Sequence, residues 1–257
     1  AHLKITEFPD LTKLVNGDIR INDIREVDII DLLGRDPVPP ISELLAKNIS
    51  GKVVMVTGAG GSIGSELCRQ IIKNQPKMLV LYELTEFALY DIDKELRQTA
   101  SCEIVPILGT VQDQQKLERI IEQYHVQTVY HAAAYKHVPL VECNPIAGLK
   151  NNAIGTANSL NAAVKKGVET FVLISTDKAV RPTNVMGASK RMAELYCQAV
   201  AETKPNTQIS IVRFGNVLGS SGSVVPLFRQ QIAKGGPITV THPDVTRYFM
   251  TIPEASQ

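Results

Sequence analysis

Thr176, Asp177 and Lys178 form a polar run directly after an apolar stretch, 170–175, that is typical of a buried strand. An adjacent carboxyl and amine could act as general acid and general base on one substrate, and a threonine hydroxyl can hydrogen-bond a substrate hydroxyl. A second lysine, Lys190, ends the nearby run Met-Gly-Ala-Ser-Lys. Taken alone, Asp-Lys after a strand is more often a solvated turn, so a catalytic interpretation depends on the elements around it.

A glycine-rich turn, Thr57-Gly-Ala-Gly-Gly-Ser-Ile-Gly64, lies between a predicted strand at 52–57 and an amphipathic helix at 63–74. Such a turn brings backbone N–H groups and a helix N-terminus against a pyrophosphate. The first glycine makes the tight turn, the second admits the phosphates, and the third lets helix pack on strand. A lone glycine triplet often marks only a flexible loop, but this context indicates a dinucleotide site, held by Gly58, Gly61, Ser62, Ile63 and Gly64.

The acidic residue Glu83 ends the next predicted strand, 78–82, about twenty residues past the glycine turn, where a carboxylate can accept hydrogen bonds from the adenosine ribose. The same carboxylate would repel a 2′-phosphate, and no Arg or Lys follows until Lys94. The sequence therefore predicts NAD rather than NADP as cofactor. The alternative is a solvated Glu that stabilises a helix N-terminus.

Strand and helix patterns alternate from residue 52 onward. The strands are nearly continuous apolar runs, as expected where both faces of a parallel sheet are covered. Six such units predict an α/β fold, a doubly wound parallel sheet of Rossmann type with ligands at the carboxyl ends of the strands. The predicted strands are 52–57, 78–82, 103–108, 128–132, 170–175 and 208–214, and the predicted helices are 63–74, 86–98, 112–124, 145–166 and 186–203.

Three regions are predicted along the chain: an N-terminal arm or linker (1–50), the NAD-binding domain (51–215) and the start of a small, incomplete substrate-binding lobe (216–257). The arm has a proline break at Pro37-Val-Pro-Pro40 and a short helix around 42–47. Both ends of the sequence look like cuts, and residues 251–257 look like a helix that has barely begun.

Composition excludes several classes of function. The net charge of +1 over 257 residues predicts no nucleic-acid partner and no attraction to an anionic membrane surface. The four cysteines are scattered, which suits a reducing compartment and predicts no metal site. No run of apolar residues is long enough to cross a bilayer, so this piece is expected to be soluble.

Beyond these local signals, the sequence resembles the extended short-chain dehydrogenase/reductases, and most closely the nucleotide-sugar 4,6-dehydratases of bacterial polysaccharide and glycan biosynthesis, of the UDP-N-acetylglucosamine type. The likeness runs from about residue 21 to the end. It is carried by the glycine turn and by His131-Ala-Ala-Ala-Tyr-Lys-His-Val138, Asn152-Ala-Ile-Gly-Thr156, Ser175-Thr-Asp-Lys178, Arg181-Pro-Thr-Asn-Val-Met-Gly-Ala-Ser-Lys190, Arg213-Phe-Gly-Asn-Val-Leu-Gly219 and Thr246-Arg-Tyr-Phe249.

Met186 departs from the pattern of the wider superfamily, whose Tyr-x-x-x-Lys motif has at this place the tyrosine that deprotonates the substrate hydroxyl. A thioether can neither give nor take a proton. Methionine is known here in a membrane-anchored subgroup that makes surface polysaccharides such as capsule and O-antigen. The resemblance therefore implies an anchor upstream of this piece, a place at the cytoplasmic face of the bacterial inner membrane, and a homo-oligomer. Thr110 also departs, since many relatives have an acid there near the adenine.

The resemblance implies a reaction on a UDP-N-acetylhexosamine such as UDP-N-acetylglucosamine. The C4 hydroxyl is oxidised, water is eliminated across C5 and C6, and hydride returns to C6. Asp177 would be the acid and Lys178 the base, which must be neutral; desolvation, the positive nicotinamide and Lys190 would favour its neutral form. Thr176 would bind the 4-hydroxyl, and Lys190 the nicotinamide ribose.

The remaining site residues follow from the same resemblance. Ala132 and Ala133 would line the cofactor site, and Lys136, His137, Asn216 and Arg247 the nucleotide-sugar site. Each of these four also has an ordinary interpretation: a loop residue with satisfied hydrogen bonds for Lys136 and His137, a turn cap for Asn216, and a surface ion pair for Arg247.

Two other functions compete with the dehydratase. A nucleotide-sugar 4-epimerase uses the same hydride abstraction but needs no acid–base pair for elimination, so Asp177-Lys178 argues against it. A catalytically silent NAD-binding regulator would explain the loss of the tyrosine, but it has no need of Thr176, Asp177, Lys178 and Lys190 together.

Overall fold

The computed structural model describes residues 38–220, 224–240, 242, 244 and 246–257, together with 6–7, 25–26, 33 and 35. The chain divides into two compact units, Ala1–Val38 and Pro39–Gln257. The described part of the first contains an antiparallel pair, β1 (Thr6–Glu7) with β2 (Arg25–Glu26). Most of the predicted arm, and Pro37 of its proline break, lie outside the described residues. The predicted boundaries at residues 50 and 215 stay predictions.

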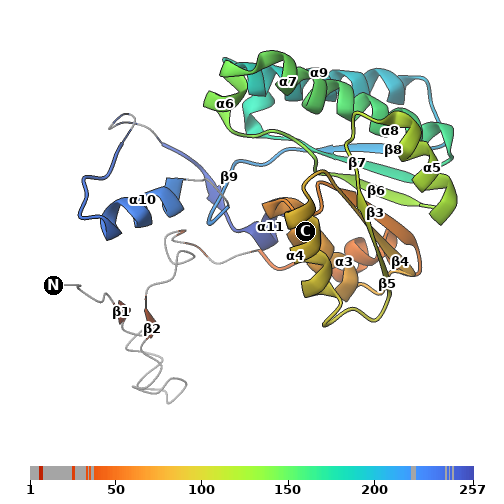
Figure 1. Cartoon of the computed structure of the whole chain (residues 1–257), viewed down its shortest axis with the longest axis horizontal. Helices are drawn as coiled ribbons and strands as arrows, with labels where there is room; N and C mark the ends of the chain where they lie inside the picture. Colours follow the sequence, from red (N-terminus) through yellow and green to blue (C-terminus); the bar gives the residue numbers. More distant parts are fainter. Residues whose placement is uncertain are drawn as a thin grey trace. The chain divides into compact units, whose positions relative to one another are not determined.

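The second unit is built on a six-stranded parallel sheet with strand order β5-β4-β3-β6-β7-β8 (Figure 1). The chain builds outward from β3 to one edge and then returns to build the other half from β6, which is the doubly wound arrangement that the sequence predicts. Fold class and sheet are thus confirmed. The strands are β3 (Val53–Thr57), β4 (Met78–Glu83), β5 (Glu103–Leu108), β6 (Thr128–His131), β7 (Thr170–Ile174) and β8 (Gln208–Val212).

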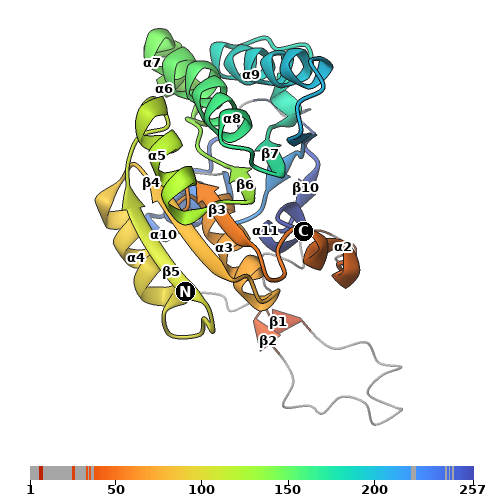
Figure 2. The same ribbon diagram turned by 90° about the vertical axis from the view of Figure 1, so that its right-hand side faces the viewer.

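Helices cover both faces of this sheet (Figure 2). One face packs against α3 (Ser62–Lys73) and α4 (Glu86–Leu96), whose buried leucines and isoleucines join those of the central strands. The other packs against α5 (Gln114–Tyr124), α8 (Gly155–Lys165) and α9 (Val185–Glu202). Successive residues of a strand point to opposite faces of the sheet. Because helices cover both faces, residues of both sets are apolar, and the strands therefore have continuous apolar sequences.

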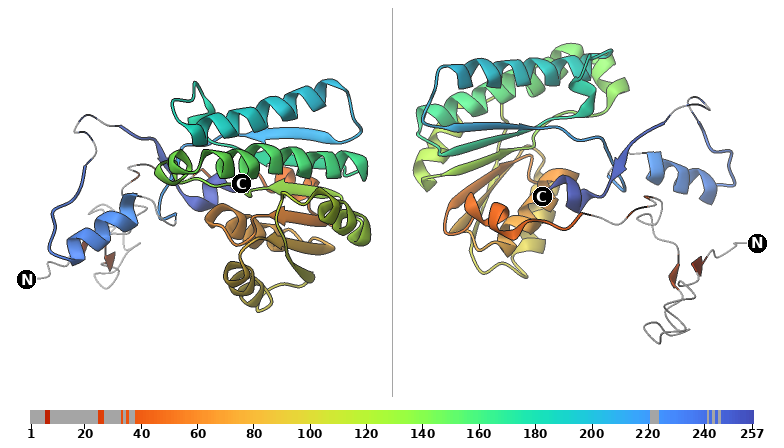
Figure 3. Two further views of the ribbon diagram at one scale, coloured as in Figure 1. Left: turned by 45° about the horizontal axis from the view of Figure 1, so that its top comes forward. Right: turned by 180° about the vertical axis from the view of Figure 1, so that it is seen from behind.

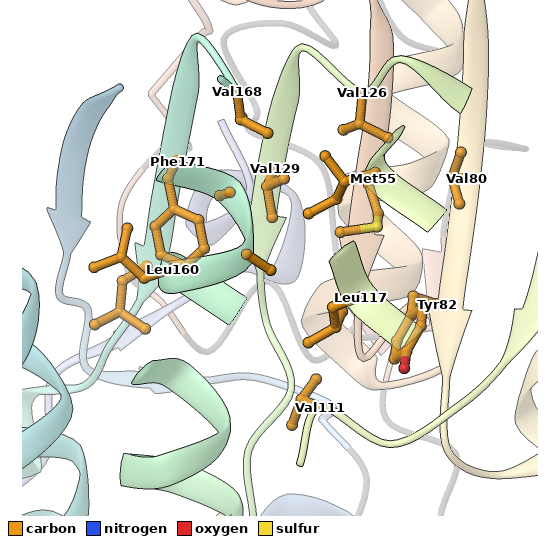
Figure 4. Packing of buried hydrophobic residues seen from close by; sticks show 14 of the residues in the cluster. Met55, Val80, Tyr82, Val111, Leu117, Val126, Val129, Leu160, Val168 and Phe171 are labelled. Atoms are coloured by element: carbon orange, nitrogen blue, oxygen red, sulfur yellow. The ribbon is translucent and has the colours of Figure 1, made fainter. Parts of the chain in front are cut away.

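The core on the second face is shown in Figure 4, where Met55, Val129 and Phe171 of the strands meet Leu117 of α5 and Leu160 of α8. All five side chains are at most 1% exposed. Burial of apolar surface on this scale is the dominant stabilising contribution to folding. It makes the sheet a rigid support for the loops at its carboxyl edge.

The structure differs from the sequence-based elements mainly between residues 138 and 165. Instead of one helix at 145–166 there are α7 (Pro145–Leu149), a π-helical turn η3 (Lys150–Ile154) and α8, preceded by an unpredicted helix, α6 (Val138–Cys143). Pro145 is the first residue of α7, and Gly167, with φ +72°, follows the C-cap residue of α8. Residues 150–152 are all polar and have no periodic pattern of apolar residues, so the sequence does not indicate that the helix is interrupted there.

The C-terminal segment adds α10 (Val224–Ala233) and a short parallel pair, β9 (Asn216–Val217) with β10 (Phe249–Met250). The last helix, α11 (Ile252–Ala255), starts with a capping box from Thr251 and lies beside α3 (Figure 3), where Gln70 Nε2 donates to the Pro253 carbonyl at 3.0 Å. The predicted short helices are present, α11 here and α2 (Ser42–Lys47) before the sheet. Within the described ranges, no helix has the length and apolar character needed to cross a membrane.

Candidate active site

One large cavity, of about 900 Å³, lies at the carboxyl ends of the central strands. The segments that follow β3, β4, β6 and β7 line it, together with the first turns of α3 and α9 and the segment around β9. Ligands of doubly wound sheets bind at this edge, beside the point where the strand order reverses. The cavity is therefore the place to look for the predicted site residues.

The glycine turn forms one wall of the cavity, and its geometry requires glycine. Gly58 has φ +70°, and a Cβ there would lie 2.7 Å from backbone atoms of Ala133. A Cβ on Gly64 would overlap the carbonyl oxygen of Gly58. Helix α3 starts at Ser62, and its N-cap residue, Gly61, has no side chain to occupy the helix N-terminus. The turn thus offers a helix N-terminus and close backbone approach to an anionic group.

Glu83 is buried rather than solvated, and it binds backbone amides both of the glycine turn and of the segment that begins α4. The side chain is 8% exposed, and its Oε2 accepts a hydrogen bond from the Gly60 amide at 3.0 Å. Its Oε1 accepts from the amides of Leu84 and Thr85 at 2.9 Å each. The carboxylate therefore ties the glycine turn to the start of α4, and it also lines the cavity.

The polar run after β7 forms a single turn of 3-10 helix, η4 (Asp177–Ala179). Thr176 is its N-cap: its hydroxyl accepts from the Lys178 amide at 3.3 Å and donates to Asp177 Oδ1 at 2.9 Å. The Asp177 amide donates to the Phe214 carbonyl at 3.0 Å, so the turn is attached to the segment after β8. The three side chains are thereby held next to one another.

Lys178 lies between two oxygen acceptors. Its Nζ is 3.2 Å from Asp177 Oδ1 and 3.2 Å from Asn216 Oδ1. The Lys178 side chain is 36% exposed and that of Asp177 49%. The predicted acid and base are thus in direct contact, and Asn216 of β9 orients the amine from the other side.

Helix α9 brings Met186 and Lys190 to the same wall. Asn184 caps it, accepting from the Gly187 amide at 2.7 Å. Gly187 packs so closely on the Lys178 carbonyl that a Cβ there would overlap it. Met186 is 3% and Lys190 4% exposed, and both line the cavity. The close packing of Gly187 on Lys178 brings the Thr176–Lys178 run and the Met186–Lys190 run together.

Lys190 is a buried ammonium group whose Nζ donates to the Ile174 carbonyl at 2.6 Å. Burial lowers the pKa of Lys190 from 10.5 to about 8, and the charges of Cys197 and Glu194 only partly oppose this. The lysine is therefore held at a cost to stability, which is typical of a group kept for function.

Replacing Lys190 with methionine is expected to raise the free energy of unfolding at pH 7 by about 1–3 kcal/mol, because it removes the buried charge. The folded-state pKa lies below the unfolded one, so wild type should gain stability as pH rises from about 8 to 10.5, and the variant should lack that gain. Urea titrations at several pH values would measure both. Equal pH profiles for the two proteins would contradict the assignment.

Glu194 is a buried carboxylate next to the cavity wall, where it binds the wall residue Ser175. The sequence did not indicate this role. Glu194 accepts from Ser175 Oγ at 2.6 Å, from Arg191 at 3.0 Å and from two nitrogens of Arg213 at 2.7 and 2.6 Å. Burial raises the pKa of Glu194, but these hydrogen bonds outweigh it and bring the pKa to about 2. Glu194 thereby holds Ser175, the residue before the polar turn.

The structure brings nearly all the predicted site residues to this one cavity. Asp177 and Arg247 are the exceptions: among the described residues, they are not part of its wall. Asp177 instead contacts Thr176 and Lys178, which are. Arg247 is exposed, and its guanidinium donates to the Thr246 carbonyl at 2.9 Å. The predicted residues on the wall are Gly58, Gly61, Ser62, Ile63, Gly64, Glu83, Ala132, Ala133, Lys136, His137, Thr176, Lys178, Met186, Lys190 and Asn216.

Fold and cavity together define a doubly wound, Rossmann-type protein with its cavity at the carboxyl ends of the strands. The chain belongs to the family described as polysaccharide biosynthesis proteins, whose family profile matches residues 54–257. This confirms the family that the sequence motifs predict.

Long relatives align along the whole chain. It is 47% identical to the capsular polysaccharide biosynthesis protein CapD of Staphylococcus aureus and 50% identical to the probable polysaccharide biosynthesis protein EpsC of Bacillus subtilis, each over 257 residues. Both alignments cover 99% of this chain and 43% of the relative. The chain thus spans less than half the length of these proteins.

Two shorter relatives have named activities. One is a UDP-N-acetylglucosamine 4,6-dehydratase (inverting) from Campylobacter jejuni, 34% identical, with 79% of this chain and 60% of that protein covered. The other is a UDP-glucose 4-epimerase from Rickettsia canadensis, 33% identical, with 78% and 59% covered. Both are nucleotide-sugar enzymes.

Solved structures show the same fold. Pen from Bacillus thuringiensis matches with a TM-score of 0.77 and 32% identity, over 81% of this chain and 66% of that one. DesIV, a dTDP-glucose 4,6-dehydratase from Streptomyces venezuelae determined with NAD and TYD bound, matches with a TM-score of 0.70 and 22% identity, over 78% and 68%. At that identity DesIV supports the fold alone.

Proposed function

We propose that this chain carries the catalytic core of an NAD-dependent UDP-N-acetylglucosamine 4,6-dehydratase that serves the synthesis of a bacterial surface polysaccharide. The observation that carries the proposal is the direct contact of Lys178 with Asp177, 3.2 Å apart, beside a cavity that Thr176 and Lys190 also line. The named dehydratase among its relatives supports it. Membrane anchoring and a homo-oligomeric state stay predictions of the resemblance.

The cavity fits a dinucleotide. A Cβ at Gly58 or Gly64 would close the glycine turn, and α3 begins there without a side-chain cap. We assign Gly58, Gly61, Ser62, Ile63 and Gly64 to the pyrophosphate, Glu83 to the adenosine ribose, Ala132 and Ala133 to the cofactor wall and Lys190 to the nicotinamide ribose. Bound NAD would supply the redox chemistry, accepting hydride from sugar C4 and returning it at C6.

Thr176 and Asp177 would handle the proton of the C4 hydroxyl. Met186 occupies the place of the usual tyrosine and cannot accept a proton. The Thr176 hydroxyl already donates to Asp177 Oδ1 at 2.9 Å, so it can receive the substrate proton as it passes its own to the carboxylate. Asp177 is then protonated when the 4-ketone forms.

Lys178 and Asp177 would together eliminate water. The ketone acidifies the C5 proton, which neutral Lys178 removes, while protonated Asp177 gives its proton to the C6 hydroxyl as that group leaves. When hydride returns to C6, C5 takes up a proton and Lys178 gives one up, to C5 itself or to solvent. Both side chains are then back in their starting states, so protons and electrons balance.

Lys136, His137 and Asn216 line the cavity and would contact the nucleotide-sugar, with Asn216 also orienting the Lys178 amine. We assign Arg247, which is exposed and outside the cavity wall, to the diphosphate of the nucleotide-sugar. Arginine suits a diphosphate because its guanidinium can donate to two phosphate oxygens at once.

The competing function is a 4-epimerase, which the named epimerase among the relatives supports. An epimerase returns hydride to C4 and eliminates nothing, so it has no need of an acid–base pair at C5 and C6. Mass analysis after incubation of the protein with NAD and UDP-N-acetylglucosamine, or with UDP-glucose, separates the two. A product lighter by one water is expected. A product of unchanged mass with inverted C4 would establish the epimerase.

Changing Glu83 to arginine is expected to shift the cofactor preference from NAD toward NADP. The carboxylate that would repel a 2′-phosphate is replaced by a group that binds it. Calorimetry with both cofactors measures the shift. Glu83→Gln is the control, because it removes the charge and keeps one oxygen, which can still accept from the amides of Leu84 and Thr85 while the Gly60 amide loses its acceptor. Equal affinity of wild type for NAD and NADP would rule out the ribose role of Glu83.

A further inference from the structure

The cavity continues outward from the glycine turn across the ends of adjacent strands. The sheet order there is β3, β4, β5, and wall residues follow each strand: the glycine turn after β3, Glu83 and Leu84 at the end of β4, and 109–111 after β5. Glu83 pairs in register with Leu108, and the Gly109 amide donates to the Glu83 carbonyl at 2.8 Å. With the pyrophosphate at the glycine turn and the ribose at Glu83, the purine base of a dinucleotide would lie against 109–111.

Thr110 is held in a fixed turn at this end of the cavity. Its carbonyl accepts from the Tyr82 hydroxyl at 3.0 Å and from the Asp113 amide at 3.1 Å. Its Oγ1 accepts from the Gln112 amide at 3.2 Å. A Cβ on Gly109 would lie 2.6 Å from the Tyr82 ring, so the segment packs directly on this tyrosine. Burial, with the charge of Asp113, raises the pKa of Tyr82 to about 12, and the hydroxyl therefore keeps the proton that it donates.

The side chains at this end offer hydroxyl groups and apolar surface to a purine. Beyond Glu83, the wall residues of the segments after β4 and β5 are Leu84, Thr85, Ala88, Gly109, Thr110 and Val111. None of these six carries a charge. Asp113, three residues after Thr110, is not part of the described wall, and its Oδ1 caps α5 by accepting from the Lys116 amide at 2.9 Å.

A hydroxyl and a carboxylate interact differently with position 6 of a purine. Adenine has an amine there, which donates, and hypoxanthine has a carbonyl, which accepts. An ionised carboxylate only accepts, so it favours the amine and repels the carbonyl. The Thr110 hydroxyl accepts from the Gln112 amide and keeps a proton and a second lone pair, so it can donate to a carbonyl or accept from an amine. A backbone N–H of the turn can likewise donate to N1 of adenine or to O6 of hypoxanthine.

We propose that Thr110 leaves the base end of the cofactor site unable to distinguish a 6-amino from a 6-oxo purine, so that the chain binds NAD and its hypoxanthine analogue with similar affinity. The inference rests on the proposed function only for the place of the dinucleotide. It does not depend on which reaction follows, since a dehydratase and an epimerase would hold the same cofactor.

The test is calorimetry of NAD and of the analogue in which hypoxanthine replaces adenine, at pH 7. The two dissociation constants of wild type are expected to agree within about threefold. Thr110→Asp should bind NAD at least about tenfold more tightly than the analogue, because an acceptor-only group would then face a carbonyl with no proton between them.

Thr110→Asn is the matched control for Thr110→Asp. The two side chains have the same shape, but a carboxamide both donates and accepts, so the asparagine variant should keep the two affinities within about threefold. Either side chain can accept from the amide two residues on, as Thr110 does, so both variants retain the turn.

A wild-type preference for NAD of about tenfold or more would overturn the inference, and so would a Thr110→Asp variant that binds both dinucleotides equally. The wild-type ratio requires no variant, so it decides the inference even where Thr110→Asp does not fold. Binding of neither dinucleotide by wild type would overturn the cofactor part of the proposed function as well, whereas unequal binding overturns the inference alone.

Discussion

Replacing Lys178 with alanine is expected to lower overall turnover by about 10²–10⁴-fold while leaving the first oxidation intact. Lys178 is the proposed base for the C5 proton, and the C4 hydroxyl proton goes to Asp177 by way of Thr176. The variant should therefore form the 4-ketone and accumulate reduced cofactor, because elimination cannot follow. Stopped-flow absorbance of the reduced cofactor and deuterium exchange at C5 measure the two stages separately.

The control for Lys178→Ala is Lys165→Ala. Lys165 is 63% exposed on α8 and pairs with Glu118 at 2.7 Å, an exposed ion pair expected to contribute little. This control should turn over like wild type. Near-normal turnover in Lys178→Ala, or loss of the first oxidation together with C5 exchange, would show that Lys178 is not the C5 base.

Replacing Asp177 with asparagine is expected to slow even the first hydride transfer, by about 10²-fold or more. Without the tyrosine, the Thr176 hydroxyl needs an acceptor for its proton, and Asp177 Oδ1 is its partner at 2.9 Å. The amide is nearly isosteric but takes up no proton at neutral pH. Single-turnover absorbance of the reduced cofactor gives the rate of this step directly.

Met186→Leu is the matched comparison for Asp177→Asn. Met186 is buried on the cavity wall, so its role in this account is to fill apolar space and exclude water. A volume-conserving exchange of Met for Leu usually costs less than about 1.5 kcal/mol of stability, and turnover should fall only modestly. If Asp177→Asn accumulates reduced cofactor as fast as wild type, Asp177 is not the first proton acceptor.

The parallel sheet could be predicted because its strands are apolar on both faces and its loops carry strong turn signals. All six strands of the sheet lie within two residues of the predicted bounds. The glycine turn was equally readable, because the positive φ at Gly58 and the close approach at Gly64 leave no other residue type. The turn geometry and the apolar strand pattern each depend on residues that are adjacent in the sequence, so the sequence alone can indicate them.

The contacts that could not be predicted join residues far apart in the sequence. Asn216 reaches Lys178 through β9, a two-residue strand too short for any periodic signal. Asn152 lies in what looked like an uninterrupted helix, and its partner Tyr135 belongs to another segment. Glu194 looked like one more polar residue on α9, although it is 0% exposed. Each depends on the tertiary fold, which sequence patterns do not contain.

The most direct test of the central claim is incubation of the protein with NAD and UDP-N-acetylglucosamine in deuterated water. Acid–base elimination by Asp177 and Lys178 predicts a product that has lost one water and gained one deuterium at C5, because the proton that C5 takes up comes from solvent, directly or through Lys178. Mass spectrometry with NMR of the sugar would locate the label. A product that keeps its oxygen, or one that loses water without deuterium at C5, would contradict the account.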